Sequence, residues 1–515
     1  MRSVLYILGW ILNIEAAFMS LPILTAVIYH EKQGLMFVIA MVLCCICGSL
    51  LSFKRPKNMR FYVREGFVCT ALGWIVMSVF GCLPFVWTGE IPGFVDALFE
   101  TVSGFTTTGA SILPEVESMS HCSMLWRCFT HWIGGMGVLV FLLAVLPMVG
   151  GSNMQLMKAE SPGPSVGKLV PKVRSTAMML YNLYITLTIA EAVLLLIAGL
   201  SPFEAICTSF GTAGTGGFGF RNDSFGSFSG AVQWIVGVFM MLFGVNFNVY
   251  YLLFMKHFRE AGRCEELRWY LAIVVAATAL ITIDLRGIGM SLPDIIRHAY
   301  FQVCTVMTTT GYSTVDFNLW PSFSKSILVI LMFVGACAGS TGGGLKVSRV
   351  AIACKSLFSY LGSFLHPHSV RRVRFEDKDV DTPTLHGIYV YFVGVAVIFV
   401  VSLLIVSLEG KDLVTTFTAV TATFNNIGPG LEMVGPMANY GHFTVLTKIV
   451  LIFDMLAGRL EIFPMLLLFY PPLWHEYVSD NSRRIRRSVR MHREAEEKEK
   501  AKAEQKSIPE EPLQK

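Results

Sequence analysis

The sequence Phe105-Thr106-Thr107-Thr108-Gly109-Ala110-Ser111 returns in closely similar form as Met307-Thr308-Thr309-Thr310-Gly311-Tyr312-Ser313. Each copy ends an apolar stretch that is shorter than the roughly 20 residues a helix needs to cross a bilayer. Two further short apolar stretches end in the related runs Ala213-Gly214-Thr215-Gly216-Gly217-Phe218 and Phe424-Asn425-Asn426-Ile427-Gly428-Pro429-Gly430. When the four stretches are aligned, they share one glycine position. The alignment predicts that Gly109, Gly216, Gly311 and Gly428 are equivalent.

Longer apolar segments flank each short stretch, which predicts a repeating unit of a long helix, a half-length helix and a second long helix. We expect pore repeats at 54–158, 159–260, 261–380 and 381–478, after a transmembrane hairpin at 1–53 and before a charged cytoplasmic tail at 479–515. The three segments of each unit are expected, in order, at 67–87, 97–111 and 124–149; 178–200, 203–220 and 231–255; 269–285, 295–314 and 323–358; and 385–408, 413–430 and 443–471.

The composition is typical of a protein that lies in a membrane. Of the 515 residues, 54% are hydrophobic and 15% are charged, whereas about 25% are charged in an average soluble domain. The first apolar run, at 4–29, is too long for the core of a cleavable signal peptide. The sequence therefore predicts an all-α polytopic membrane protein, with about ten transmembrane helices and the four repeats arranged around a central pore.

Basic residues gather in the linkers between the repeats, while the loops beside the half-length segments contain few of them. Cytoplasmic loops carry an excess of Lys and Arg, so we expect these linkers and both termini to lie in the cytoplasm. The same charge favours contact with anionic membrane lipid. The residues are Lys54, Arg55, Lys57, Arg60 and Arg64; Lys158, Lys168, Lys172 and Arg174; Lys256, Arg259, Arg263 and Arg268; and Lys355, Arg371, Arg372 and Arg374.

The four short runs have the chemistry of a cation filter. A desolvated cation needs oxygen ligands, and inward-pointing backbone carbonyls supply them. Glycine permits the unusual backbone and the close approach to an axis. One such run would be read as an ordinary helix C-cap, but four at equivalent positions favour a filter. Its candidate residues are Thr107, Thr108, Gly109, Gly214, Thr215, Gly216, Thr309, Thr310, Gly311, Asn426, Ile427 and Gly428.

A second glycine-rich run, Gly335-Ala336-Cys337-Ala338-Gly339-Ser340-Thr341-Gly342-Gly343-Gly344-Leu345-Lys346, lies midway along the expected helix 323–358. Each glycine costs a helix about 1 kcal/mol relative to alanine, so a loop inside the membrane is predicted. The alternative is a closely packed helix interface. Arg459 is the candidate partner, because an intramembrane Arg is a functional candidate and can bind the carbonyls of a broken helix. An ion pair with Glu461 or Asp454 is the alternative for Arg459.

These features resemble the Trk/Ktr/HKT superfamily of potassium transporters. The four helix–pore loop–helix units and the single filter glycine per unit carry the resemblance to the superfamily. The N-terminal hairpin and His131-Trp132-Ile133-Gly134-Gly135-Met136-Gly137 are similar to its TrkH branch. The resemblance covers about 4–474, nearly all of the chain apart from the tail.

The resemblance implies gated, channel-like K⁺ uptake across a bacterial inner membrane, with K⁺ as the permeant ion. It also implies that Gly339, Gly342, Gly343, Gly344, Lys346 and Arg459 form an intramembrane gate. A homodimer and a separate cytosolic ring of Trk-A-type subunits, which bind NAD(H) and adenine nucleotides, are the expected partners. The alternative in the same class is a K⁺/H⁺ or K⁺/Na⁺ symporter.

Other classes of protein are disfavoured. The sequence lacks an H-E-x-x-H motif and a paired intramembrane His or Asp constellation, so an enzyme is not expected. Gly214 to Gly219 matches G-x-G-x-x-G but follows a membrane segment rather than a strand. No nucleotide is therefore expected on this chain, and no nucleic-acid partner. Glu15 and Glu191 lie in apolar segments, where packing is favoured over a proton relay.

Overall fold

The chain is mostly helical, as the sequence predicts. The structure, a computed structural model, describes residues 2–54, 56, 63–137, 173–366 and 372–474. The charged tail, the end of the expected helix 124–149 and several linker residues lie outside this range. Those linker residues are Arg55, Lys57, Arg60, Lys158, Lys168, Lys172 and Arg371.

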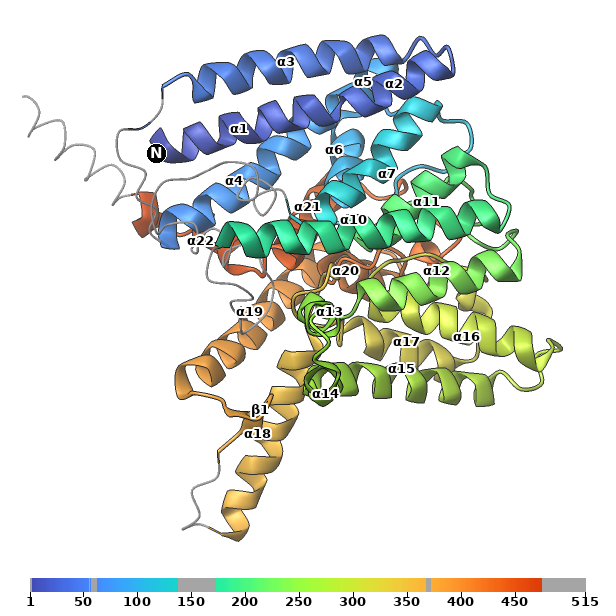
Figure 1. The fold of residues 1–515 in the computed structure, drawn as a ribbon, viewed down its shortest axis with the longest axis vertical. Helices are drawn as coiled ribbons and strands as arrows, with labels where there is room; N and C mark the ends of the chain where they lie inside the picture. The colour runs from blue at the N-terminus through green and yellow to red at the C-terminus, as the bar shows by residue number, and fades with distance from the viewer. Residues whose placement is uncertain (1, 55, 57–62, 138–172, 367–371, 475–515) are drawn as a thin grey trace, which may run out of the picture. The chain divides into compact units, whose positions relative to one another are not determined.

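The first two apolar segments form helices that lie side by side (Figure 1). Glycines permit this close packing, because a Cβ on Gly9 would approach the carbonyl oxygen of Gly48 to 2.6 Å. Small residues bring membrane helices together in this way. The helices are α1 (Arg2–Phe18), α2 (Ser20–Ile28) and α3 (Gly34–Ser52).

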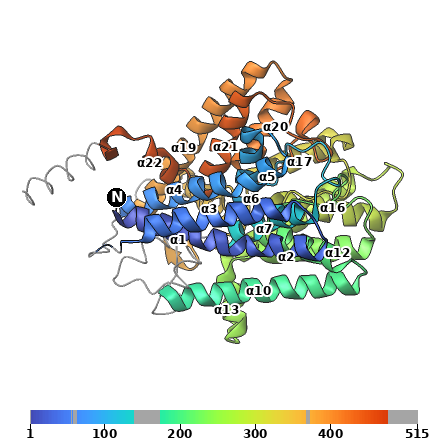
Figure 2. The same ribbon diagram turned by 90° about the horizontal axis from the view of Figure 1, so that it is seen from above.

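The long first helix of each predicted repeat is continuous or nearly so. Together with the hairpin, these helices account for the six spans that are long and apolar enough to cross a membrane within the described residues. Figure 2 shows α10 running nearly parallel to α1 and α2. The first helices are α4 (Val63–Gly81) with α5 (Leu83–Thr88), α10 (Val173–Ile197), α15 (Glu265–Asp284), and α19 (Thr382–Val406) with the 3₁₀ turn η2 (Ser407–Glu409).

The second helix of each predicted repeat is short or broken. The helices α12 and α13 bend by 92° at a break of no more than four residues, and they give a seventh span if they are counted as one. The predicted break in 323–358 is present, but breaks also interrupt 231–255 and 443–471, which were expected to be continuous. The helices are α7 (His121–Gly135); α12 (Gly230–Phe243), α13 (Phe247–Phe254) and α14 (Phe258–Arg263); α17 (Ser322–Met332) and α18 (Val347–Leu365); and α21 (Val445–Arg459) and α22 (Phe463–Leu468).

The four half-length segments form helices that lie within the bundle. Three begin at a side-chain cap, since Ser201, Ser291 and Asp412 each accept a hydrogen bond from a backbone N–H of the first turn. Such caps satisfy the exposed amides of a helix start. The helices are α6 (Phe94–Phe105), α11 (Pro202–Gly214), α16 (Leu292–Met307) and α20 (Leu413–Phe424), and the 3₁₀ turns η1 (Phe317–Leu319) and η3 (Glu432–Val434) follow the last two.

One small element departs from an all-helical chain. The basic linker after α18 forms a two-stranded antiparallel hairpin of β1 (Arg374–Phe375) and β2 (Lys378–Asp379). Glu376, in the turn of this hairpin, accepts a hydrogen bond from the backbone N–H of Glu266 over 3.0 Å, and so caps the start of α15. Figure 1 shows this hairpin beside α18.

Candidate ion pathway

All four half-length helices end in the same backbone motif. In each, a residue at or just after the helix C-cap has a positive φ, of 57° at Thr107, 54° at Thr215, 58° at Thr309 and 54° at Asn426. The next amide then donates back to a carbonyl of the last helical turn, as from Thr108 to Ser103 over 2.9 Å and from Gly216 to Gly211 over 2.8 Å. The equivalent bonds of Thr310 and Ile427 also measure 2.8 Å. This is a Schellman C-cap.

The motif corrects the alignment of the second repeat by one residue. Two positions after each of these residues stands a glycine with a positive φ, of 79° at Gly109, 90° at Gly311 and 93° at Gly428. In the second repeat this glycine is Gly217, with a φ of 80°, and Gly216 takes the place of Thr108. We therefore define the four glycine turns as residues 107–109, 215–217, 309–311 and 426–428.

The four glycine turns contact one another in a closed cycle. A Cβ on Gly109 would meet the carbonyl oxygen of Gly216 at 2.1 Å, and one on Gly217 would meet that of Thr310 at 2.0 Å. A Cβ on Gly311 would meet that of Ile427 at 2.2 Å, and one on Gly428 would meet that of Thr108 at 2.6 Å. Any side chain at these four glycines would therefore collide with backbone. The cycle brings the predicted carbonyls together at one place.

An open cavity of about 130 Å³ borders the cycle on one side. All four glycines of the turns line it, and Arg127 is a charged residue on its wall. The carbonyl groups of the residues before the glycines are the groups that could bind a cation here. They belong to Thr108, Gly216, Thr310 and Ile427, and backbone carbonyls are suitable ligands for a dehydrated alkali ion.

His131 explains why the second turn is rich in glycine. The ring is buried, Nδ1 lies 2.7 Å from the carbonyl oxygen of Gly104, and Nε2 accepts from the amide of Phe218 over 3.2 Å. A Cβ on Gly216 would lie 2.1 Å from this ring, and one on Gly214 would lie 2.2 Å from the His131 carbonyl oxygen. The imidazole therefore fills space that a side chain occupies in the other turns.

The glycine-rich run does form a loop, which connects α17 to α18 and packs against three of the glycine turns. We call it the 335–346 loop. The amide of Gly343 donates to Thr309 Oγ1 over 2.8 Å, and Thr215 Oγ1 donates to the carbonyl of Thr341 over 3.1 Å. A Cβ on Gly343 would meet Asn426 at 2.7 Å. The loop therefore lies directly beneath the turns, on the side away from the open cavity.

The bent helix pair α12–α13 and a buried carboxylate hold the other side of this loop. The amide of Phe247 donates to the carbonyl of Gly339 over 3.1 Å, so the loop satisfies an amide that the break in the helix leaves free. Glu266, which is 3% exposed, accepts from the amide of Ala338 over 2.7 Å and from Asn246 Nδ2 over 3.2 Å. The sequence did not single out Glu266.

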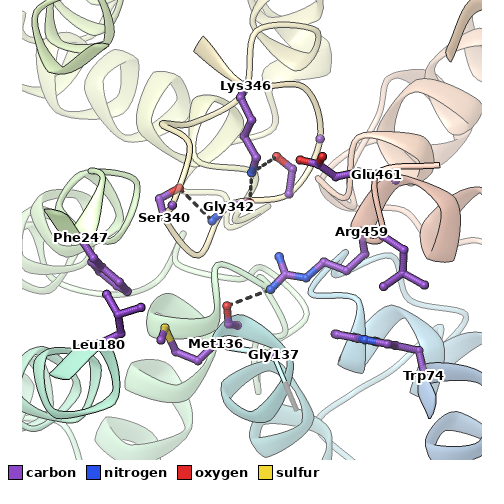
Figure 3. Close-up of a pocket in the computed structure, with 16 residues that line it drawn as sticks. Trp74, Met136, Gly137, Leu180, Phe247, Ser340, Gly342, Lys346, Arg459 and Glu461 are labelled. Carbon is purple, nitrogen blue, oxygen red and sulfur yellow. Dashed lines mark hydrogen bonds between the residues drawn. The ribbon is translucent and has the colours of Figure 1, made fainter. Parts of the chain in front are cut away.

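Two basic side chains, of Lys346 and Arg459, border a second cavity, of about 70 Å³, beside the loop (Figure 3). Arg459 donates to the carbonyls of Thr341 over 2.8 Å, of Gly134 over 2.5 Å and of Gly135 over 2.9 Å. Lys346 donates to the carbonyls of Gly342 and Gly343. Arg459 therefore joins the loop to the end of α7, as expected for a residue that binds carbonyls freed by broken helices.

The acidic neighbours of Arg459 have other partners. Glu461 pairs with Arg349 of α18 over 2.5 Å, and Asp454 accepts from Ser402 Oγ over 2.6 Å. Glu15 and Glu191 are 1% and 0% exposed. In the described residues, no group of three or more His, Cys, Asp or Glu side chains is arranged to hold a metal ion.

Comparisons with known proteins identify the family of this chain. Residues 33–476 match the family model of TrkH, described as a cation transport protein. The chain belongs to the TrkH family. This is a family of transport proteins rather than of enzymes, and the long apolar helices make this member a multi-pass membrane protein.

Named relatives in the TrkH family match over almost their whole length. The chain is 35% identical to the Trk system potassium uptake protein TrkH of Salmonella typhimurium, over 92% of this chain and 99% of that one. The protein of that name from Escherichia coli K12 gives the same figures. The crystal structure of the potassium transporter TrkH from Vibrio parahaemolyticus superimposes with a TM-score of 0.82 at 32% identity, covering 92% of this chain and 99% of that one.

Proposed function

We propose that this chain takes up K⁺ through a gated, channel-like pore in the bacterial inner membrane. The observation that carries the proposal is the closed cycle of the four glycine turns, which gathers backbone carbonyls from four half-helices at one place. The C-terminal ends of those helices also point partial negative charge there. The names of the TrkH relatives, potassium uptake proteins, favour K⁺ as the ion.

In this proposal the four glycine turns are the selectivity filter. Each turn contributes the carbonyl of the residue before its glycine, so the second repeat contributes Gly216 and uses Gly217 as the turn glycine. In the other three turns the candidate filter residues keep the positions that the sequence predicted, whereas Gly214 precedes the second turn. The repeats at 54–158, 159–260, 261–380 and 381–478 then surround one pore in each chain.

The 335–346 loop is the proposed gate. It lies under the filter, the buried Lys346 donates to two of its carbonyls, and the bridging Arg459 places positive charge beside it. Such charge repels a cation that leaves the filter. Opening would require the loop to give up its bonds to Arg459, Thr215 and Thr309.

Regulation and assembly complete the proposal. The basic linkers and the β1–β2 hairpin face the cytoplasm in the expected topology, where they would bind a cytosolic Trk-A-type ring that carries the nucleotide.

Two chains would associate as a homodimer in the membrane. Chemical crosslinking of the purified protein in lipid should yield a dimer, and the monomer alone would contradict this part of the proposal.

The decisive test is ion flux in proteoliposomes, with and without an imposed proton or Na⁺ gradient. A channel-like pore should carry Rb⁺ down its own gradient. An imposed proton or Na⁺ gradient should change the rate only through its effect on the membrane potential. Clamping that potential with an ionophore provides the control. Accumulation of Rb⁺ against its gradient, driven by protons or Na⁺, would support the symporter instead.

Orientation is predicted by the basic linkers. Reporter fusions placed after Lys57, Lys172, Arg263 and Arg372 should all report the cytoplasm, because an even number of crossings separates each from the next. A fusion in the loop after α6 should report the opposite side and serves as the control. A periplasmic signal from any of the four linkers would contradict the assignment of the repeats.

A further inference from the structure

A buried ion pair lies behind the first two glycine turns. Glu100 of α6 and Arg127 of α7 are 1% and 3% exposed, and Arg127 Nε donates to Glu100 Oε1 over 2.6 Å. Buried pairs contribute little net stability, because both charges lose their hydration. The other contacts of this pair indicate what it does.

The Glu100 carboxylate holds the chain that leaves the first turn. Ser111 Oγ donates to Oε1 over 3.0 Å, and the amide of Ile112 donates to Oε2 over 2.9 Å. These residues follow Gly109 by two and three positions. Both carboxylate oxygens therefore fix the strand just outside the proposed filter.

The Arg127 guanidinium holds the matching strand of the second turn. Its Nη1 donates to the carbonyl of Gly219 over 2.9 Å, and its central carbon lies 3.7 Å from the centroid of the Phe218 ring. Gly219 follows Gly217 as Ser111 follows Gly109. One ion pair thus connects equivalent positions of two neighbouring strands, at the wall of the open cavity.

The third repeat provides an internal comparison. Gln302 stands at the place of Glu100, and its Nε2 donates to Ser313 Oγ over 3.0 Å. A neutral amide is therefore sufficient to hold the serine that follows a turn. The charge of Glu100 serves the additional connection to Arg127, and through it to the second strand.

We infer that the Glu100–Arg127 pair is a positioning unit, which fixes the spacing of the first two filter strands and so favours K⁺ over Na⁺. The inference rests on the proposed function. Carbonyl ligands discriminate between the two ions through the size and field of their ring. A brace that sets the distance between Thr108 and Gly216 controls both properties, although neither Glu100 nor Arg127 touches the ion.

Glu100→Gln tests the brace with the residue that the third repeat already uses. Charge-assisted hydrogen bonds are about twice as strong as neutral ones, so the variant should loosen both strands. We expect the K⁺/Na⁺ permeability ratio, from reversal potentials in mixed ions, to fall by about tenfold. Ser111→Ala removes one of the bonds without leaving a charge unpaired, and its ratio should fall less.

Glu31→Gln is the matched control. Glu31 accepts from the amides of His121 and Cys122 over 2.7 and 2.9 Å, so its loss loosens the start of α7 without touching a filter strand. This variant should unfold at a lower temperature and keep the parent ratio. An equal fall in the ratio for Glu31→Gln would overturn the inference, because loosening α7 alone would then explain the effect.

The remaining outcomes separate the brace from the filter itself. The inference would also be overturned if folded Glu100→Gln and folded Ser111→Ala both keep the K⁺/Na⁺ permeability ratio of the parent chain. If Glu100→Gln does not fold, Ser111→Ala decides alone. Gly109→Ser, measured in parallel, tests the filter. A changed ratio in Gly109→Ser with none in the brace variants contradicts only the brace, whereas an unchanged ratio in Gly109→Ser contradicts the proposed function.

Discussion

Arg459→Ala should raise K⁺ flux per folded protein by about tenfold or more. The change removes three hydrogen bonds that join the 335–346 loop to α7, and a charged hydrogen bond contributes about 1.5–3 kcal/mol. A barrier lowered by that amount corresponds to a tenfold or larger increase in rate. The Arg459→Ala change also removes a charge that, in the proposed gate, repels the permeant ion. The measurement is Rb⁺ uptake into proteoliposomes, with the cytosolic ring and its nucleotide present or absent.

Shortening the loop within 339–344 should have the same effect, because it removes the obstruction itself. In both variants the flux should depend less on the ring, and the preference for K⁺ should remain, since the proposed filter is intact. Arg286→Ala is the control. Arg286 lies just beyond the C-terminal end of α15, whereas Glu266, which binds the loop, lies at the start of that helix. Lower flux at unchanged expression in both gate variants would contradict the gate and leave Arg459 a structural residue.

Gly109→Ser should lower the K⁺/Na⁺ permeability ratio by about tenfold and reduce K⁺ flux. The added Cβ would lie 2.1 Å from the carbonyl oxygen of Gly216, at a φ of 79°. A strained backbone of this kind costs about 1–3 kcal/mol, and relief of the collision must displace a proposed ligand. Bi-ionic reversal potentials measure the ratio directly.

Gly89→Ser separates strain from crowding. Gly89 has nearly the same φ, 78°, but a Cβ there would meet nothing within 4 Å. It should lose a similar amount of stability while keeping the parent selectivity. Coinciding reversal potentials for Gly109→Ser and the parent chain would exclude Gly109 from the filter.

The parts of the fold that depend on local pattern could be predicted from the sequence. Apolar length predicted the long first helices, and the repeated Thr-Thr-Thr-Gly runs located the ends of the half-length helices. The glycines of the 335–346 loop predicted the break between α17 and α18, because a helix rarely tolerates so many. Arg459 was found because a charge among apolar residues is conspicuous.

Features that depend on tertiary contacts could not be predicted in this way. The second repeat offers Gly214, Gly216 and Gly217, and only the backbone angles identify the equivalent of Gly109. A single glycine, Gly244, gave no sign of a 92° bend, which is supported by bonds from a loop distant in sequence. Glu266 follows Glu265 at the start of an apolar helix, where both acids look like ordinary flanking residues.

The cycle of turns has a consequence for how such a pore can change over time. In a channel built from four identical subunits, one codon alters all four positions of a ring together. Here the positions before the turn glycines already differ, as threonine, glycine, threonine and isoleucine at Thr108, Gly216, Thr310 and Ile427. If the cycle is the proposed filter, a mutation changes only one quarter of the ring, so ion preference can change in small increments. At Gly216, for example, the His131 ring occupies the space that a side chain would need.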